Sequence, residues 1–395
     1  MGDKHYIFSK RPSGRVLAGC VLFICVALAA CGSPPDSSGG HSGSGSGSGS
    51  NSSVSSGVPV CTMGSVDPTV NCSTQLLLAG PYQVATSGGH GTSQITDTTR
   101  PTSACGTCAA IPTGRTLTTW YWFPSNDGIH LAAGGPFPLI VYIHGDGGTG
   151  DGGLYIEQQL ASLGYIVASF DQVLTSKTTL ADCGQICSSS PNSDTPNIPG
   201  DVSFFMTQIL SGSDPATAPF YAMIDTSRIG LLGFSLGGGI ATEVGFDQTN
   251  HDSRVKLVVG QSPAYFSSIT FYKPSAGQLP PYLIMYGTMD ETLNIYNASY
   301  TGYTPGGPYY KLDNGSKDFA ALAGGTHTGF SQYYDQDIIT SIPGAIAANR
   351  QEQLAILGGV SFIQLYFNPN QNVRNFMYRY LSQGYAAENS EVTWQ

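Results

Sequence analysis

The sequence predicts an α/β fold in which a mostly parallel central sheet carries helices on both faces. Two observations indicate it. Apolar runs alternate with longer amphipathic or glycine-rich stretches, as expected when crossover helices connect parallel strands. The apolar runs are also continuous, which is typical of strands covered on both faces. The expected strands are residues 138–144, 165–171, 227–235, 255–263, 281–290 and, with fewer β-branched side chains, 318–327.

Other segments complete this expected fold. Residues 117–124 predict an antiparallel edge strand, because the run ends at a proline that cannot donate to a ladder. Residues 202–210 predict a helix, since their apolar side chains recur at helical spacing, and Pro199 suits a first helical turn. Two closing helices are expected near the end of the chain, at 357–367 and 376–381.

The N-terminus predicts an export signal. A basic start is followed by an apolar run from Val16 to Ala30, which is shorter than the roughly 20 residues of a membrane-spanning helix. The run ends in Leu28-Ala29-Ala30-Cys31, which resembles the lipobox of bacterial lipoprotein signal peptides. That resemblance implies cleavage before Cys31 and a lipid on its sulfur. The alternative is an ordinary signal peptide followed by a chance cysteine.

The chain is expected to divide into three parts. Residues 1–30 form the lipoprotein signal peptide. Residues 31–57 form a flexible tether, because glycine and serine dominate there and almost no apolar side chain is available to bury. Residues 58–395 form one folded domain. We therefore expect an exported protein, either a lipoprotein of the bacterial cell envelope or a secreted one, that touches the membrane only through its lipid.

The charge balance excludes several partners. Without the four basic residues and one acidic residue of the first thirty, the chain has 12 basic and 25 acidic side chains, a formal charge of −13. A surface this acidic disfavours nucleic acid and anionic lipid as partners. We therefore expect no nucleic-acid partner. We also expect no metal, no organic cofactor and a monomeric protein, although these expectations do not follow from the charge.

The cysteines predict disulfide bonds. Six remain in the expected domain, and an even number in an exported chain predicts three disulfides. Their spacing suggests three pairs of neighbours, although other pairings are possible. The alternative for Cys105-Gly-Thr-Cys108 is a redox pair, but it lacks the strand-to-helix start typical of such motifs. Zinc is disfavoured, since no histidine pair has ligand spacing nearby. The suggested pairs are Cys61 with Cys72, Cys105 with Cys108, and Cys183 with Cys187.

A single serine lies among glycines in RIGLLGFSLGGG, residues 228–239. In a chain with 51 glycines a bare G-x-S-x-G arises about once by chance, so its position must support it. Ser235 ends an expected buried strand, just before a helix that begins near Leu236. A sharp turn there would strain the serine backbone and expose its Oγ at the sheet edge. Gly233 and Gly237 would then let the strand and the helix pass closely.

A serine nucleophile needs a base, and the base needs an orienting acid. Asp290 ends the strand YLIMYGTMD and is the expected acid, with Glu291 as its alternative. Asp313 and Asp318 fit worse, because they lie at or before the start of the next strand. His327, in the loop GGTHTGF after the last strand, is the expected base. His251 precedes every candidate acid in a polar loop, where we expect it to be solvated.

An oxyanion hole needs two N–H donors. The N–H of Leu236 is one by position, since it follows the serine at a helix N-terminus. The second is expected in the loop HGDGG, residues 144–148, where the N–H of Asp146 is the candidate. The alternative for this loop is a plain turn. His144 is expected to be structural.

These pieces together resemble the α/β-hydrolase superfamily, in particular the branch of platelet-activating-factor acetylhydrolases, dienelactone-hydrolase-like esterases and bacterial polyester hydrolases. The resemblance implies an α/β-hydrolase fold, with Ser235 as nucleophile, Asp290 as acid, His327 as base, and the amides of Asp146 and Leu236 as oxyanion hole. Asp146 departs from the family, which usually has an apolar or aromatic residue there. The matching segments are GPYQV (80–84), 115–124, 144–148, 200–210, 224–238, 286–291 and 324–330.

The resemblance implies that residues 58–395 are the catalytic domain of a serine hydrolase that cleaves carboxylic esters through an acyl-enzyme. Polyester, lipid-ester and small-ester substrates all stay open. The weaker alternatives are a peptidase and a non-catalytic surface-binding protein on the same fold. Tyrosines in an apparent insertion either line the pocket or are exposed loop residues: Tyr296, Tyr300 and Tyr303.

Overall fold

The computed structural model describes residues 72–100, 114–178, 194–264, 270, 279–293, 317–332, 339 and 341–395. The expected signal peptide and tether lie outside these residues. So do Cys31, Cys61, Cys105, Cys108, Cys183, Cys187 and the three tyrosines, Tyr296, Tyr300 and Tyr303. Cys72 is described and is disulfide-bonded. None of the helices in the described part of the chain is long and apolar enough to span a bilayer.

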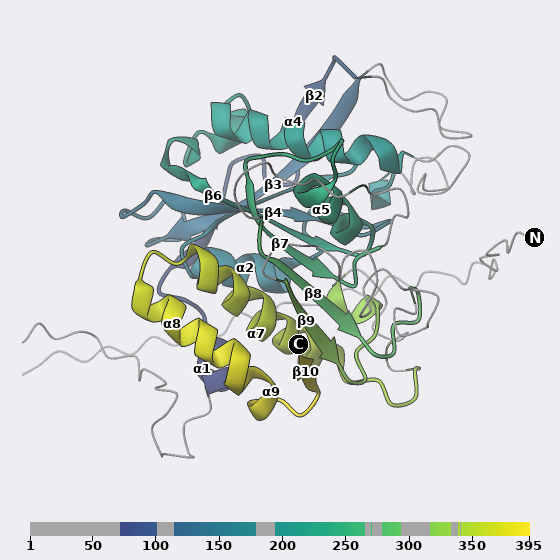
Figure 1. The fold of residues 1–395 in the computed structure, drawn as a ribbon. Coiled ribbons are helices and arrows are strands. Elements are labelled where there is room, and N and C mark those ends of the chain that lie inside the picture. The colour runs from purple at the N-terminus through teal and green to yellow at the C-terminus, as the bar shows by residue number, and fades with distance from the viewer. Residues whose placement is uncertain are drawn as a thin grey trace, which may run out of the picture. The chain divides into compact units, whose positions relative to one another are not determined.

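The central sheet has ten strands in the order β1-β3-β5-β4-β6-β7-β8-β9-β10, with β2 paired to β3 beside this path (Figure 1). The six strands from β5 to β9 in this order are parallel, and the outer strands are antiparallel. The expected parallel core is therefore confirmed. The bounds are β1 Gln83–Thr86, β2 Ser93–Asp97, β3 Arg115–Ser125, β4 Phe137–Ile143, β5 Ile166–Asp171, β6 Ile224–Phe234, β7 Val255–Gln261, β8 Tyr282–Gly287, β9 Lys317–Leu322 and β10 Val392–Trp394.

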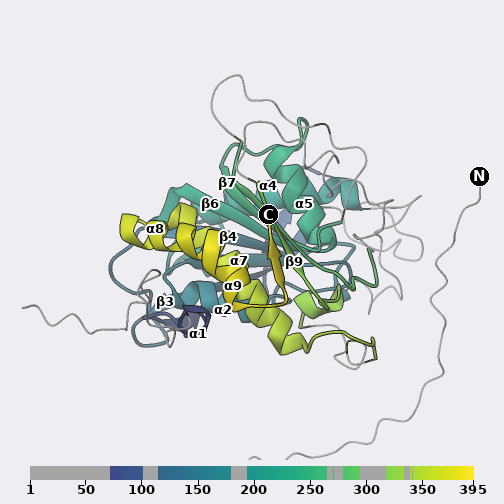
Figure 2. The same ribbon diagram turned by 60° about the horizontal axis from the view of Figure 1, so that its bottom comes forward.

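Helices cover both faces of this sheet (Figures 1 and 2). Alternate residues of β4 belong to two separate apolar clusters, with Leu139 and Val141 on one face and Ile140 on the other. The first cluster includes side chains of α4 and α5, and the second includes α2 and α7. The helices are α1 Cys72–Leu76, α2 Leu154–Ser162, α4 Ile198–Ser211, α5 Leu236–Phe246, α7 Ala348–Phe367, α8 Gln371–Arg379 and α9 Tyr385–Glu388, with a π-helical turn at Tyr380–Gly384.

Three sequence expectations need correction. Strand β3 is antiparallel but does not form the edge, because β1 and β2 pair along one side of it and β5 along the other. Pro124 lies beyond Thr118–Trp122, the residues that pair with β5, and stands opposite Val84 of the short strand β1. The closing helix α7 begins at Ala348, nine residues before the expected start. The second closing helix ends at Arg379, and the chain continues there as a π-helical turn.

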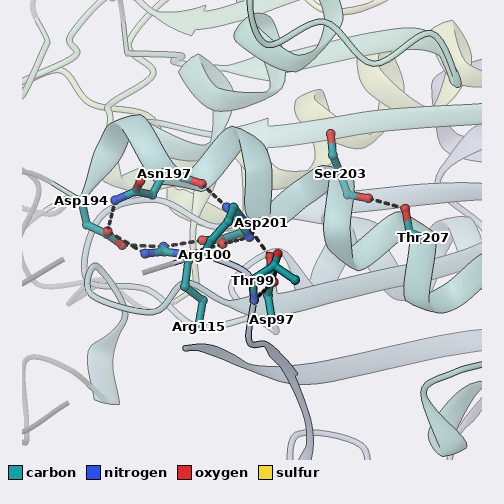
Figure 3. A network of polar contacts seen from close by, with 9 residues as sticks. All are labelled: Asp97, Thr99, Arg100, Arg115, Asp194, Asn197, Asp201, Ser203 and Thr207. Carbon is teal, nitrogen blue, oxygen red and sulfur yellow. Dashed lines mark hydrogen bonds and ion pairs between the residues drawn. The ribbon is translucent and has the colours of Figure 1, made fainter. Parts of the chain in front are cut away.

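An arginine cluster joins the start of β3 to the start of α4 (Figure 3). We define it as Arg100, Arg115, Asp97, Asp194 and Asp201. Arg115 is fully buried and donates to both oxygens of Asp194 and both oxygens of Asp201, at 2.6–2.9 Å. Because Thr118 of β3 pairs with Asp171 at the end of β5, this cluster lies at the edge of the sheet where the parallel strands end.

Candidate active site

Ser235 occupies the turn between β6 and α5. Its backbone has φ 52° and ψ −119°, a region that costs a residue with a side chain about 1–3 kcal/mol. The end of β7 and the loop after it hold the turn in place. The Ser235 N–H donates to the Gln261 carbonyl at 2.9 Å, and the Ser235 carbonyl accepts from the Ala264 N–H at 2.8 Å. The strained turn expected from the sequence is therefore confirmed.

Glycines allow three backbone segments to meet beside this serine. A Cβ on Gly233 would lie 2.2 Å from the Gly237 carbonyl oxygen, and a Cβ on Gly237 would lie 2.0 Å from the Ile143 oxygen. Both distances are too short for a side chain, so only glycine fits. A Cβ on Gly145 would come within 3.1 Å of the Ser235 Cβ. The loop after β4 therefore lies directly against the serine.

Three side chains from three strand ends converge on one line. The Ser235 Oγ lies 2.8 Å from His327 Nε2, and His327 Nδ1 lies 2.7 Å from Asp290 Oδ2. All three side chains are buried. Ser235 follows β6, Asp290 follows β8, and His327 follows β9, so the carboxyl ends of the parallel strands place them together. A proton of the serine can pass to the imidazole while the carboxylate holds the other ring nitrogen.

The Asp290 carboxyl is held in its charged form. Burial raises its pKa, but hydrogen bonds from His327 and from the Leu293 N–H outweigh burial, and the pKa lies below its usual value. The Leu293 N–H donates to Oδ1 at 2.6 Å and the Thr292 N–H at 3.0 Å. One carboxylate oxygen is thus fixed by its own loop, which leaves the other for the imidazole.

Glu291, the alternative acid, does not contact the imidazole. Its two carboxylate oxygens accept from the backbone N–H groups of His327 at 2.8 Å and Thr328 at 3.2 Å. On the other side of the histidine, the side-chain amide of buried Gln351 accepts from the Thr326 N–H at 2.9 Å and donates to the Thr326 carbonyl at 2.7 Å. The sequence did not indicate either contact. Gln351 belongs to α7 and has no local signal linking it to the histidine loop.

The loop after β4 is held in place by residues that directly follow β5. His144 is buried, and burial lowers its pKa to about 4, so the ring is neutral. Its Nδ1–H donates to the Gly145 carbonyl at 2.7 Å, while Nε2 accepts from the Gln172 N–H at 3.0 Å. The Gly147 N–H donates to the Thr175 carbonyl at 2.7 Å. His144 is therefore structural, as expected.

The predicted oxyanion donors flank Ser235. Leu236 is the first residue of α5, where N–H groups have no partner inside the helix. Asp146 follows Gly145, the residue of the β4 loop that lies against the serine. The positions agree with the expectation, and the donor roles stay predictions.

The remaining candidates lie elsewhere. His251 follows α5, and its N–H donates to the Asp247 carbonyl at 2.9 Å. Asp318 lies at the start of β9, the opposite end of the strand from His327. Asp313 lies outside the described residues. Within the described ranges, no group of three or more His, Cys, Asp or Glu side chains is arranged to hold a metal ion.

Comparison with known proteins identifies a similar fold. No family model matches the chain, and no curated protein matches it. Among solved structures, the chain is similar to a ferulic acid esterase from Streptomyces cinnamoneus, with a TM-score of 0.55 and 19% sequence identity. The match covers 80% of this chain and 97% of that one. This likeness confirms the α/β fold class.

Proposed function

We propose that this protein is a serine hydrolase that cleaves carboxylic esters through an acyl-enzyme. The observation that supports the proposal is the line from Ser235 Oγ through His327 to Asp290, with steps of 2.8 and 2.7 Å. The strained backbone at Ser235 is a second support, since strain of this kind gathers at functional sites. The similar fold belongs to a protein named as an esterase.

In the first half of the reaction, His327 takes the proton of Ser235 while Oγ attacks the ester carbonyl carbon. Asp290, kept anionic by its hydrogen bonds, stabilises the imidazolium that forms. The N–H groups of Leu236 and Asp146 hold the negative charge that develops on the carbonyl oxygen. The C–O bond of the ester then breaks, and His327 returns the proton to the departing alcohol.

The second half repeats these steps with water. His327 removes a proton from a water molecule, which attacks the acyl carbon on Ser235. The tetrahedral intermediate uses the same N–H donors. When it collapses, the carboxylic acid leaves and Ser235 Oγ recovers its proton from His327.

The finer assignments belong to the same proposal. We place the chain in the branch of platelet-activating-factor acetylhydrolases, dienelactone-hydrolase-like esterases and polyester hydrolases, on the motifs given above. We also propose an exported protein with a lipid on Cys31. The cell-envelope location rests on the sequence of residues 1–57.

A fluorophosphonate label tests the proposed nucleophile. We expect labelling at Ser235, located by peptide mapping, and its loss in Ser235→Ala. Labelling at another residue, or none in folded protein, contradicts the proposal. His327→Ala should lower labelling and ester hydrolysis together, because the serine loses its base.

A substrate panel tests the ester class. We would compare p-nitrophenyl esters of rising chain length, a feruloyl ester, a polyester film and a peptide amide. A preference for short soluble esters indicates a small-ester hydrolase, and turnover of long-chain or polymeric esters indicates a lipid or polyester hydrolase. Turnover of the amide alone contradicts the ester proposal. For the anchor, Cys31→Ser should abolish partition into detergent.

A further inference from the structure

The loop that carries His327 is held by a second carboxylate. We propose that Glu291 is a positioning residue that fixes the backbone of His327 and stabilises its charged ring during the reaction. This inference rests on the proposed function, because the position of His327 matters for catalysis only if the imidazole carries the proton.

The contacts place Glu291 on the backbone of the histidine. Its Oε2 accepts from the His327 N–H at 2.8 Å, and its Oε1 accepts from the Thr328 N–H at 3.2 Å. These N–H groups open the short 3₁₀ turn Thr328–Phe330, where the first donors have no partner within the turn. Hydrogen bonds to an ionised carboxylate are about twice as strong as bonds between neutral groups.

Two carboxylates that are consecutive in the chain therefore hold the side chain and the backbone of His327. Asp290 contacts the ring at Nδ1, and Glu291 contacts the main chain of the same residue. Both follow β8, so a shift of the histidine loop away from β8 would break both contacts. The 2.8 Å contact between Nε2 and Ser235 depends on this position. A misplacement of 1 Å can cost about 10²-fold in rate.

Glu291 also brings a second carboxylate to the residue that carries the imidazole. Four described side chains contact His327, namely Ser235, Asp290, Glu291 and the ring of Phe234, at 5.0 Å between centroids, and the Phe330 N–H donates to the His327 carbonyl at 3.3 Å. The charged ones among them are the two carboxylates. A negative charge nearby favours the imidazolium, which forms in each transition state. Gln351 hydrogen-bonds the backbone of the neighbouring Thr326, but its side-chain amide is neutral.

Kinetics of three variants test the assignment on the full chain, with p-nitrophenyl butyrate as probe. Glu291→Ala should lower kcat about tenfold and leave KM within about twofold, because the side chain contacts the backbone of His327 and Thr328 and acts through the position of the base. Glu291→Asp should recover part of the loss, since it keeps two acceptor oxygens. Glu291→Gln keeps one acceptor but no charge. Its acidic limb of kcat/KM against pH should move about 0.3–0.5 unit lower.

Asp127→Asn is the matched charge control. Asp127 is an exposed carboxylate between β3 and β4, at the edge where β4 begins, opposite the triad. The Asp127→Asn variant should have the same kcat and the same pH profile as the parent. The exposed position of Glu291 means that its variants should fold, which thermal melting would check.

The outcomes separate the two proposals. An active parent, labelled at Ser235, whose Glu291→Ala variant keeps full kcat overturns the role of Glu291 alone. Equal loss in the Ala, Asp and Gln variants, with no shift of the pH profile, also overturns it, because any structural damage would do the same. A parent that is neither labelled nor active overturns the proposed function itself.

Discussion

In the triad one carboxylate faces a histidine, whereas in the arginine cluster one guanidinium lies between two carboxylates. The triad, and Arg115 with Asp194 and Asp201, are buried at the edge where the parallel strands end. Arg115 makes four hydrogen bonds to Asp194 and Asp201, which hold its pKa above the usual value despite the opposing effect of burial. The triad makes one bond on each side of His327.

The difference separates a static charge from a movable one. Every charge of the arginine cluster has a permanent opposite charge, and Arg100 adds a second cation beside Asp201 and Asp97. In the triad the positive charge forms only when a proton leaves Ser235. In a buried site that must move a proton, the groups that carry the proton cannot all be held in permanent ion pairs. In a site that only joins two elements, such as β3 and α4, every charged group can be. Substitutions in the two groups should therefore have opposite consequences.

Replacing Ser235 should separate activity from stability. Ser235→Gly and Ser235→Ala should each lower ester hydrolysis by about 10⁴-fold or more, because the nucleophile is lost. The glycine variant should be more stable than the alanine variant by about 1 kcal/mol, since glycine tolerates φ 52° and alanine does not. Urea unfolding of both variants measures this difference. Equal stability, or a more stable alanine variant, contradicts the assignment of strain.

Replacing Arg115 should lower the stability of the protein and leave its activity largely unchanged. Arg115→Met should lower the free energy of unfolding by about 3–5 kcal/mol, because Asp194 and Asp201 stay buried without their cation. The kcat of the protein that remains folded should change little. Urea unfolding and active-site titration with the fluorophosphonate label would measure the two quantities.

Arg100→Met is the matched control for this change. Its side chain is 28% exposed, against none for Arg115, so water can replace part of the lost interaction. We expect a loss of about 1 kcal/mol. A loss as large as that of Arg115→Met would show that burial does not distinguish the two arginines.

Glu243 on α5 carries a buried carboxyl group. Among the described residues it is paired neither with a histidine, as in the triad, nor with an arginine, as in the arginine cluster. Burial, together with the nearby charge of Asp247, raises its pKa to about 7, and Asn250 donates one hydrogen bond at 3.2 Å. Because the pKa of Glu243 is higher in the folded state than in the unfolded state, the free energy of unfolding falls as pH rises from 4.5, the ordinary pKa, through about 7. Glu243→Gln should therefore be more stable than the parent at pH 8, on the order of 1–3 kcal/mol, and equal to it near pH 4. Urea unfolding at both pH values measures this. A difference that does not depend on pH would contradict it.

The parallel strands and the serine turn could be predicted because their signals are local. Continuous apolar runs fix β4 and β6, and the glycines around Ser235 show where backbones must pass closely. Chain order then indicated Asp290 and His327, since strand ends of a parallel sheet share one edge. Short antiparallel strands gave no comparable signal. Strand β10 has three residues, too few for a period, and β1 has four.

The arginine cluster could not be predicted. Arg115 and Asp201 are 86 positions apart, and each residue taken alone is an ordinary charged side chain. The sequence favoured Asp290 over its neighbour Glu291 as the acid, but it gave no sign that Glu291 contacts the same histidine. Only their directions in space differ, one toward the imidazole and the other toward the backbone of the same histidine.

The sequence by itself determined which strands are buried on both faces, where a hydroxyl is lifted on a tight turn, and which histidine comes late enough in the chain to meet it. These properties depend on apolar periodicity and on glycine, whose effects act within a few residues. The tertiary structure alone decided which carboxylate holds the backbone of that histidine and which arginine is buried between aspartates. Those choices depend on contacts of 2.6–3.2 Å between residues remote in the chain, and only packing of the sheet edge sets such distances.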